Sequence, residues 1–206
     1  WVTKGQKLKG FKAMVTAGPT HEHIDPVRYI GNPSSGKMGI ALAKCLADMG
    51  CKVKLILGPT YHTVDHPNIE TVNVTSANEM YLASQKYFPE SDLAIFAAAV
   101  ADYSPKQYSD KKTKKKEGDL HLELKRTEDI AQRLGEVKTD RQITVGFALA
   151  TNNEEFNAQS KLERKRFNFI VLNSLNDKGA GFGGTTNKVT IYDDNGRKTA
   201  FDLKSK

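Results

Sequence analysis

The amino-acid sequence predicts an α/β protein with a three-layer, doubly wound and mostly parallel sheet. Apolar runs of strand length alternate with helical patterns over most of the 206 residues, as they do in successive βαβ units. Near the C-terminus two strand patterns flank an Asp-Asn-Gly turn, which indicates an antiparallel hairpin. We therefore expect a Rossmann-like sheet with a C-terminal antiparallel hairpin, and ligands beyond the carboxyl ends of its strands.

The length suits one domain, because 206 residues can bury a sizeable core but are too few for two typical domains. Residues 1–10 lack an apolar signal core and do not begin with Met, so we expect a linker there and a single domain over residues 11–206. The longest apolar run, residues 93–101, is too short to cross a membrane. Cys45 and Cys51 have no CxxC spacing, which favours reduced thiols in a cytoplasmic protein.

The first strand is expected at residues 11–18, an apolar run ending in Gly, and a long polar loop follows it up to Asn32. A helix is expected next, capped by Ser34 or Ser35 and ended by Gly50. Its apolar residues recur at helical spacing and are Met38, Leu42, Cys45, Leu46 and Met49.

The alternation continues through the middle of the chain. Strands are expected at residues 52–58 and 69–75, and Ser76 is placed to cap a helix over residues 77–88. Residues 92–100 form a nearly continuous apolar run, which suits a strand buried in the middle of a parallel sheet.

The last part of the chain begins with alternating residues 120–126, expected as a strand, after which Thr127 is placed to cap a helix over residues 128–138. A buried strand, a charged helix, a further strand and the hairpin follow at residues 142–150, 152–167, 168–175 and 187–204.

The stretch at residues 31–39, GNPSSGKMG, has the spacing of a phosphate-binding P-loop. Met38 stands where a P-loop needs a hydroxyl, and the stretch lies well past the first strand, so we do not expect a P-loop. Ser34, Ser35 and Gly36 instead form a small-residue turn at a helix start, which predicts an anion cradle. A plain helix start is the alternative interpretation.

Several other residues could contact an anionic or planar ligand. Arg28 is suited to a carboxylate or phosphate, and the amide of Asn32 to an oxyanion. Ala98 and Ala99 end the central strand in small side chains, which let a planar ring or a ribose approach the backbone, and Asp102 follows them. A tightly packed strand end explains the same alanines without a ligand.

Part of the net charge of +7 comes from a lysine block at residues 111–116. The block could close over a polyphosphate, or it could be a solvated charge run or a nucleic-acid contact. Lys161 and Lys165 share a helix face and could reach one polyphosphate. The glycine-rich residues 179–184 lack the helix that a dinucleotide motif needs. The histidines show no convincing metal spacing.

Several motifs in this order resemble phosphopantothenoylcysteine synthetase. The matching stretches are VTAGPTHEHIDPVRYIGNPSSGKMGIALA, AAAVADYSP, the lysine block, EDIA, VGFALATNN, KLERK and FIVLN. The resemblance implies that residues 11–206 are a nucleotide-binding synthetase domain, fused in the full chain to an upstream flavin-dependent decarboxylase. It also implies a homodimer whose site is completed by the partner subunit, with the edge strands as a candidate interface.

The resemblance implies a ligase reaction of coenzyme A biosynthesis. The carboxylate of 4′-phosphopantothenate attacks the α-phosphate of CTP, pyrophosphate leaves, and the cysteine amine displaces CMP from the acyl-cytidylate. Mg²⁺ is expected to be held mainly through the nucleotide phosphates and water. Eukaryotic relatives use ATP, so ATP stays open as the nucleotide. We expect neither nucleic acid nor a membrane as a partner, and a basic nucleic-acid-binding module is the alternative from another class.

The resemblance also assigns roles to residues. Lys112 matches the lysine that promotes acyl-cytidylate formation; its spacing from Asp102 favours it over Lys111, which stays as the alternative. Asn32 and Arg28, with the backbone at Ala99, match groups of the second half-reaction. The positions that match nucleotide contacts are Asp102, Glu128, Asp129, Ile130, Ala131, Phe147, Lys161 and Lys165.

Overall fold

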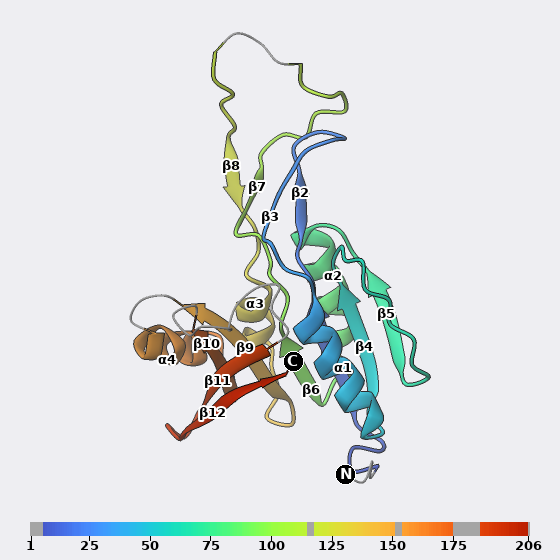
Figure 1. Ribbon diagram of the computed structural model, residues 1–206, viewed down its shortest axis with the longest axis vertical. Helices are drawn as coiled ribbons and strands as arrows, with labels where there is room; N and C mark the ends of the chain where they lie inside the picture. The colour runs from blue at the N-terminus through green and yellow to red at the C-terminus, as the bar shows by residue number, and fades with distance from the viewer. Residues whose placement is uncertain (1–5, 115–117, 151–153, 175–185, 206) are drawn as a thin grey trace.

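A central sheet dominates the computed structural model, which describes residues 6–114, 118–150, 154–174 and 186–205. Its strands are β1 (Lys12–Ala17), β4 (Lys52–Leu57), β5 (Ile69–Asn73), β6 (Leu93–Phe96), β9 (Ile143–Ala150), β10 (Phe169–Ser174), β11 (Thr186–Asp193) and β12 (Lys198–Ser205). They lie in the order β12-β11-β10-β9-β6-β1-β4-β5 (Figure 1). The strands from β10 to β5 pair in parallel, and β11 and β12 add an antiparallel edge. The predicted fold class is confirmed.

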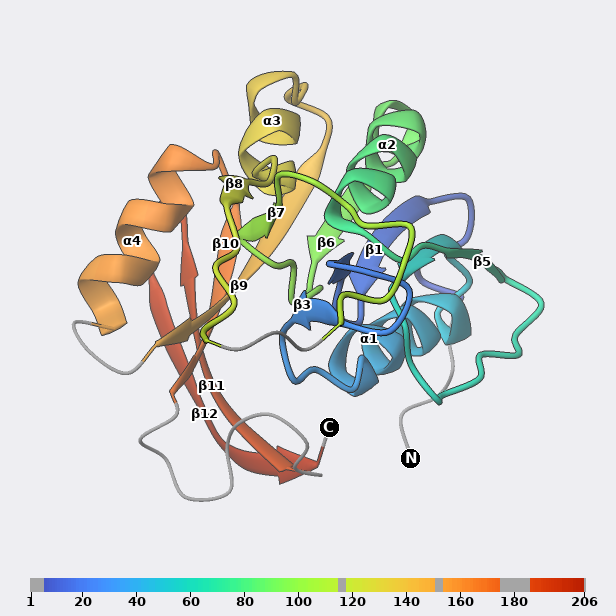
Figure 2. The ribbon, with the colours of Figure 1, turned by 90° about the horizontal axis from the view of Figure 1, so that it is seen from above.

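Helices cover both faces of this sheet (Figure 2). They are α1 (Lys37–Asp48), α2 (Ala77–Tyr87), α3 (Ile130–Glu136) and α4 (Glu154–Arg164), and a 3₁₀ turn, η1, spans Phe88–Glu90. Val15 of β1 packs in the cluster on the α1 side, and its neighbour Met14 packs with α2 and α3 on the other side. Burial on both faces explains why the central strands are apolar without alternation.

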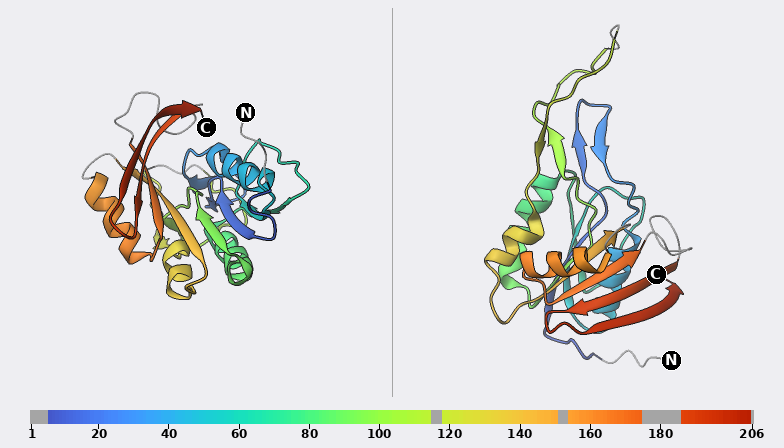
Figure 3. Two further views of the ribbon diagram at one scale, coloured as in Figure 1. Left: turned by 90° about the horizontal axis from the view of Figure 1, so that it is seen from below. Right: turned by 90° about the vertical axis from the view of Figure 1, so that its left-hand side faces the viewer.

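Two short antiparallel pairs lie outside the main sheet. β2 (His21–His23) pairs with β3 (Tyr29–Gly31) inside the expected loop, and β7 (Tyr103–Pro105) pairs with β8 (Leu124–Arg126). Together with the described residues between β7 and β8 they form an arm, which projects beyond the carboxyl edge of the sheet (Figures 1 and 3). The expected strand over residues 120–126 is therefore wrong in extent and partner, because only its last three residues pair, and they pair within the arm.

Two of the expected helix caps are corrected. Gly36, with φ 77°, precedes α1 without a side-chain cap, so neither Ser34 nor Ser35 caps it. Asp129 caps α3 by accepting from the Gln132 N–H, while the Thr127 hydroxyl donates to the Ala101 carbonyl. The cap predicted at Ser76 is confirmed, since its hydroxyl accepts from the Glu79 N–H.

The end of the expected linker contacts the domain. The N–H of Leu8 donates to the Met49 carbonyl at 2.9 Å, and the Leu8 side chain packs against the α1 side of the core. No described helix is long and apolar enough to cross a membrane.

Replacing Gly36 should destabilise the protein measurably. Its left-handed backbone costs an L-residue about 1–2 kcal/mol, and an added Cβ would meet the Gly18 Cα at 3.3 Å. Gly196 is a matched control, because its φ is +80° but nothing lies within 4 Å of an added Cβ. We expect Gly36→Ala to lower the free energy of unfolding in urea by more than Gly196→Ala does. Equal losses would contradict the close approach to Gly18.

Candidate functional site

A cavity of about 870 Å³ lies at the carboxyl ends of the central strands. Its walls come from the turn before α1, the residues after β6, the start of α3, strand β9 and helix α4. The expected site residues that line it are Asn32, Ser34, Ser35, Gly36, Ala98, Ala99, Asp102, Glu128, Asp129, Ile130, Ala131, Phe147, Lys161 and Lys165. The structure thus brings together in one place almost all of the residues singled out in the sequence.

The wall formed by Ala98 and Ala99 is fixed through the backbone. After β6 the chain leaves the sheet, yet the Ala97 N–H donates to the Thr16 carbonyl at 3.1 Å and the Ala99 N–H to the Gly18 carbonyl at 2.9 Å. The small side chains of this segment leave its backbone close to the cavity, as expected. The expected strand over residues 92–100 therefore ends early, at Phe96, but its remainder stays tied to the residues of and after β1.

Asn32 is held against the same wall. Its Nδ2 donates to the Val100 carbonyl at 3.1 Å and to the Ala99 carbonyl at 3.4 Å. The amide nitrogen, expected to donate to an oxyanion, is thus already bonded to the protein. The carboxamide oxygen is the atom of Asn32 that can receive a donor from a ligand.

The turn before α1, formed by Ser34, Ser35 and Gly36, lines the cavity. Gly36 turns the chain through its left-handed conformation, and the Ser35 carbonyl accepts a hydrogen bond from the Thr60 hydroxyl at 2.8 Å. The N-terminus of a twelve-residue helix then presents unpaired N–H groups and the positive end of its dipole. This is the geometry of an anion cradle.

Basic side chains outnumber acidic ones in the cavity lining. The basic residues are Lys37, Arg126, Lys161, Arg164 and Lys165, and the acidic ones are Asp102, Glu128 and Asp129. Two of the acids are engaged, since Glu128 bonds Arg133 and Asp129 bonds Lys165, each at 2.9 Å. Among the described residues, no carboxylate lies within ion-pairing distance of Arg126, Lys161 or Arg164. The cavity therefore favours a polyanion.

Lys161 shows how strongly positive this wall is. Burial lowers the pKa of its ammonium group, and the neighbouring charges of Lys165 and Arg164 lower it further, against the opposing effect of Asp102 and Asp129. A bound phosphate would raise this pKa again by supplying negative charge.

Sequence reasoning missed Asn173 as a site residue. Phe147 of β9 pairs with Val171 of β10, so Phe147 and Asn173 lie on the same face of neighbouring strands. Asn173 lines the cavity, and its buried Oδ1 has no hydrogen-bond partner among the described residues. An Asn that ends an apolar strand run was the available signal. A buried acceptor without a partner suits a donor from a ligand.

Arg28 and Lys112 do not line the cavity. Arg28 bonds the Asp25 carboxylate through Nε at 3.1 Å and Nη2 at 2.7 Å, and Nη2 also donates to the Thr113 carbonyl at 2.6 Å. Its guanidinium therefore ties the β2–β3 hairpin to residues 111–114 of the arm, which we call the lysine segment; Lys115 and Lys116 of the predicted lysine block lie outside the described residues. Lys112 is exposed in that segment. The glycine-rich residues 179–184 lie outside the described residues.

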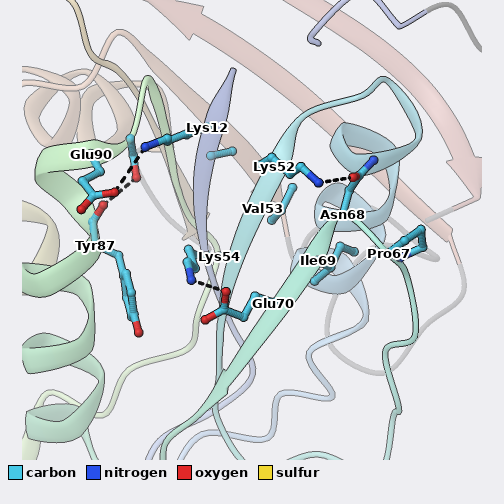
Figure 4. Close-up of a pocket in the computed structure, with 12 residues that line it drawn as sticks. Lys12, Lys52, Val53, Lys54, Pro67, Asn68, Ile69, Glu70, Tyr87 and Glu90 are labelled. Atoms are coloured by element: carbon cyan, nitrogen blue, oxygen red, sulfur yellow. Dashed lines mark hydrogen bonds and ion pairs between the residues drawn. The ribbon is translucent and has the colours of Figure 1, made fainter. Parts of the chain in front are cut away.

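A smaller cavity of about 300 Å³ lies at the other end of the sheet, where β1, β4 and β5 begin (Figure 4). Its basic side chains are already engaged: Lys12 with Glu90, Lys54 with Glu70, and Lys52 with Asn68. We therefore place the anion site in the larger cavity. The described residues contain no group of three or more His, Cys, Asp and Glu that could hold a metal ion.

Comparison with known proteins gives consistent matches. Residues 8–206 match the family described as the DNA/pantothenate metabolism flavoprotein C-terminal domain. The chain is 46% identical over 201 residues to the coenzyme A biosynthesis bifunctional protein CoaBC of Bacillus subtilis (strain 168), covering 97% of this chain and 49% of that protein. It is 51% identical over 199 residues to a protein of an unknown prokaryotic organism named cysteine/cysteine sulfinic acid decarboxylase, covering 97% and 55%.

A solved structure supports the same relationship. The crystal structure of the C-terminal domain of a coenzyme A biosynthesis bifunctional protein CoaBC matches with a TM-score of 0.80 and 39% identity, covering 96% of this chain and 89% of that one. The chain spans about half the length of the curated relatives it matches.

Proposed function

The chain belongs to the DNA/pantothenate metabolism flavoprotein C-terminal domain family, the phosphopantothenoylcysteine synthetase domain of bifunctional coenzyme A proteins, and from that premise we propose that it ligates 4′-phosphopantothenate to cysteine with CTP. One observation carries the proposal. The turn from Ser34 to Gly36 at the start of α1, the basic side chains of α4 and the hydrogen-bonded backbone of Ala98 and Ala99 all line one cavity. A reaction between a phosphorylated acid and a nucleoside triphosphate needs such a site.

The first half-reaction joins the two anionic substrates. The 4′-phosphopantothenate carboxylate forms a bond to the α-phosphorus of CTP, and the bond from that phosphorus to the bridging oxygen breaks as pyrophosphate leaves. Negative charge shifts onto the leaving group in this step, and fixed cations stabilise it most where water is excluded. Lys161 and Lys165 line the cavity and would serve this role, and the turn from Ser34 to Gly36 would bind a phosphate group.

Mg²⁺ would accompany the triphosphate and neutralise part of its charge. The cavity lining offers the Asp102 carboxylate, whereas Glu128 and Asp129 are engaged in ion pairs. This fits a cation held mainly by phosphate oxygens and water, since Mg²⁺ commonly keeps several water ligands.

The second half-reaction forms the amide bond. The cysteine amine attacks the carbonyl carbon of the acyl-cytidylate, the bond to CMP breaks, and the amine releases a proton. Asn32 contributes its Oδ1, because its Nδ2 is bonded to the Ala99 and Val100 carbonyls. Accepting a hydrogen bond from the amine would orient the nucleophile toward the acyl carbon.

The base of the nucleotide has a candidate platform in Phe147. Its neighbour Asn173 offers a buried acceptor without a partner, which suits the exocyclic amino group of cytosine or adenine and gives no bond to the corresponding oxygen of uracil. The proposal therefore favours CTP or ATP over UTP. The small side chains of Ala98 and Ala99 leave the backbone open to the nucleotide as well.

A nucleotide panel tests the reaction. The purified chain would be incubated with 4′-phosphopantothenate, Mg²⁺ and each of CTP, ATP, GTP and UTP, and pyrophosphate release would be measured. We expect the fastest release with CTP, and 4′-phosphopantothenoylcysteine in the mass spectrum once cysteine is added. Fastest release with ATP would show that the activating nucleotide is ATP and not CTP. Absence of release with all four nucleotides would disprove it.

We propose a homodimer in which the arm carries the contact between copies. Three leucines alternate along the segment that leads into β8, and all three are exposed: Leu120, Leu122 and Leu124 are 57%, 41% and 40% exposed. Several exposed apolar side chains close together on a projecting arm suit a protein interface. The same arm holds Lys112 away from its own cavity, so we propose that it serves the cavity of the partner copy.

A charge on the arm should break the dimer. Leu122→Asp would bury a carboxylate in the proposed interface, and we expect the dissociation constant of the dimer to rise about thirtyfold or more. Leu82 of α2 is a matched control, since it is also an exposed leucine, at 54%, but lies off the arm. Sedimentation equilibrium should show a dimer for Leu82→Asp and a monomer for Leu122→Asp. The proposal would be contradicted if both variants were dimers, or if the parent protein were a monomer.

The full protein is proposed to carry a flavin-dependent decarboxylase domain upstream, because the bifunctional relatives extend well beyond the part that this chain matches. We place the reaction in the cytoplasm, since Cys45 and Cys51 are both free thiols, as suits a reducing compartment.

A further inference from the structure

Asp25, a buried carboxylate in the arm, accepts hydrogen bonds both from its own hairpin and from a distant segment. Asp25 is fully buried. Its Oδ1 accepts from the N–H groups of Val27 and Arg28, at 2.9 and 3.0 Å. Its Oδ2 accepts from the Arg28 guanidinium and from the Thr113 N–H, at 2.7 and 3.1 Å. Burial alone raises the pKa of Asp25, but these bonds outweigh it and hold the pKa well below its usual range.

The bonds of Thr113 join two distant parts of the sequence. Its N–H donates to Asp25 and its carbonyl accepts from Arg28, so both polar groups of one peptide segment are held by one ion pair. A second tie lies nearby, where the Ser109 N–H donates to the Ile24 carbonyl at 3.0 Å. Lys112 is the residue before Thr113, so its backbone is held between these two ties.

We call Asp25 and Arg28, with the two backbone groups of Thr113 that they bind, the clamp. The β2–β3 hairpin that carries Asp25 and Arg28 is itself fixed to the domain. The buried Glu22 of β2 accepts from the N–H of Ala77, the first residue of α2, at 2.8 Å. The His21 N–H donates to the Thr75 carbonyl at 2.8 Å. Asn32, one residue beyond β3, is bonded to the cavity wall. The lysine segment is thus connected through a short rigid hairpin to the cavity edge.

We propose that Asp25 and Arg28 are positioning residues, which fix the lysine segment through the two backbone groups of Thr113 and so set where Lys112 acts. The inference rests on the proposed function for the role of Lys112, but the clamp itself does not. A planar guanidinium bonded to a buried carboxylate suits this task, because its donors have fixed directions. The segment carrying Lys112 then needs less ordering when substrate binds.

Thr113 allows the clamp to be broken without touching its buried residues. Thr113→Pro removes the N–H from which Asp25 accepts a hydrogen bond, whereas Thr113→Ala keeps this N–H. We expect amide hydrogen exchange in the peptide over residues 106–112 to accelerate about tenfold or more in Thr113→Pro and to stay unchanged in Thr113→Ala. We expect kcat for CTP-dependent pyrophosphate release to fall about tenfold in Thr113→Pro alone, with KM for 4′-phosphopantothenate changed less than about twofold.

If Thr113→Pro does not fold, a second variant provides the test. Arg28→Lys keeps a positive charge beside Asp25 but lacks the fork that reaches both Asp25 and Thr113, and it should show the same two changes. Unchanged exchange in both variants would overturn the clamp. Faster exchange with unchanged kcat would overturn the positioning of Lys112. If the parent protein releases no pyrophosphate, the proposed function fails, and hydrogen exchange still decides whether the clamp exists.

Discussion

Lys112→Ala should reduce CTP-dependent pyrophosphate release by about 10²–10³, the usual cost of removing one group that stabilises a developing charge in an enclosed site. The fold should be unchanged, because Lys112 is exposed and lies in the arm. Lys111 is a matched control, since it is the neighbouring exposed lysine of the same segment. We expect Lys111→Ala to keep its rate within about threefold. The measurement is a steady-state assay of pyrophosphate at saturating substrates.

The position of Lys112 adds a second test of the same prediction. If Lys112 serves the partner's cavity, a dimer of one Lys112→Ala copy and one Asn32→Asp copy contains one complete site. Co-expression of the two inactive variants should then restore about a quarter of the parent activity, because half of the dimers are mixed. Equal losses in Lys111→Ala and Lys112→Ala would remove the specific role of Lys112. Absence of restored activity would show that each copy uses its own lysine.

The fold was predictable because its determinants are local. Met14 and Val15 point to opposite faces of β1 and are both fully buried, so the strand is apolar throughout and can be recognised without its partners. The C-terminal hairpin was equally visible, since Asp194 and Asn195 form its turn, the Gly196 N–H closes it by donating to the Asp193 carbonyl, and Gly196 has a positive φ that favours glycine.

The arm was not predictable in the same way. Its strands have three residues each, and Tyr103 of β7 pairs with Arg126 of β8, so the pairing depends on residues that are far apart in the sequence. The alternation over residues 120–126 looked like a half-buried strand, but Leu120 and Leu122 are exposed in one copy of the chain. Alternation shows which side is apolar and does not show what covers it.

The candidate site shows the same division. Asn32 and Asp102 could be expected together because parallel strands deliver their following residues to one edge of the sheet. Lys161, in the last turn of α4, was expected there through the family resemblance, and all three residues line the cavity. The partners of Arg28 could not be expected, since Thr113 is 85 residues away. The cap at Gly36 was missed for a similar reason, because its close approach to Gly18 is a tertiary contact.

Asn32→Asp should separate the two half-reactions. The Ala99 and Val100 carbonyls now accept hydrogen bonds from Nδ2 of Asn32 at 3.4 and 3.1 Å. A carboxylate at this position would place negative charge against these carbonyls, so the side chain would move away from them or become protonated. We expect ligation to cysteine to fall about a hundredfold. The basic wall around Lys161 stays intact, so pyrophosphate release should continue for about one equivalent per site and then stop.

Rapid-quench measurement of pyrophosphate and CMP would show this directly, because acyl-cytidylate accumulates when pyrophosphate is released without CMP. Asn68→Asp provides the control: it makes the same change of charge at the far end of the sheet, in the smaller cavity, and should leave both products unchanged. Equal loss of pyrophosphate and CMP in Asn32→Asp would place Asn32 in the first half-reaction. Full turnover would mean that the amine is oriented by other groups, since the Oδ1 proposed to hold it would then carry no part of the transition-state stabilisation.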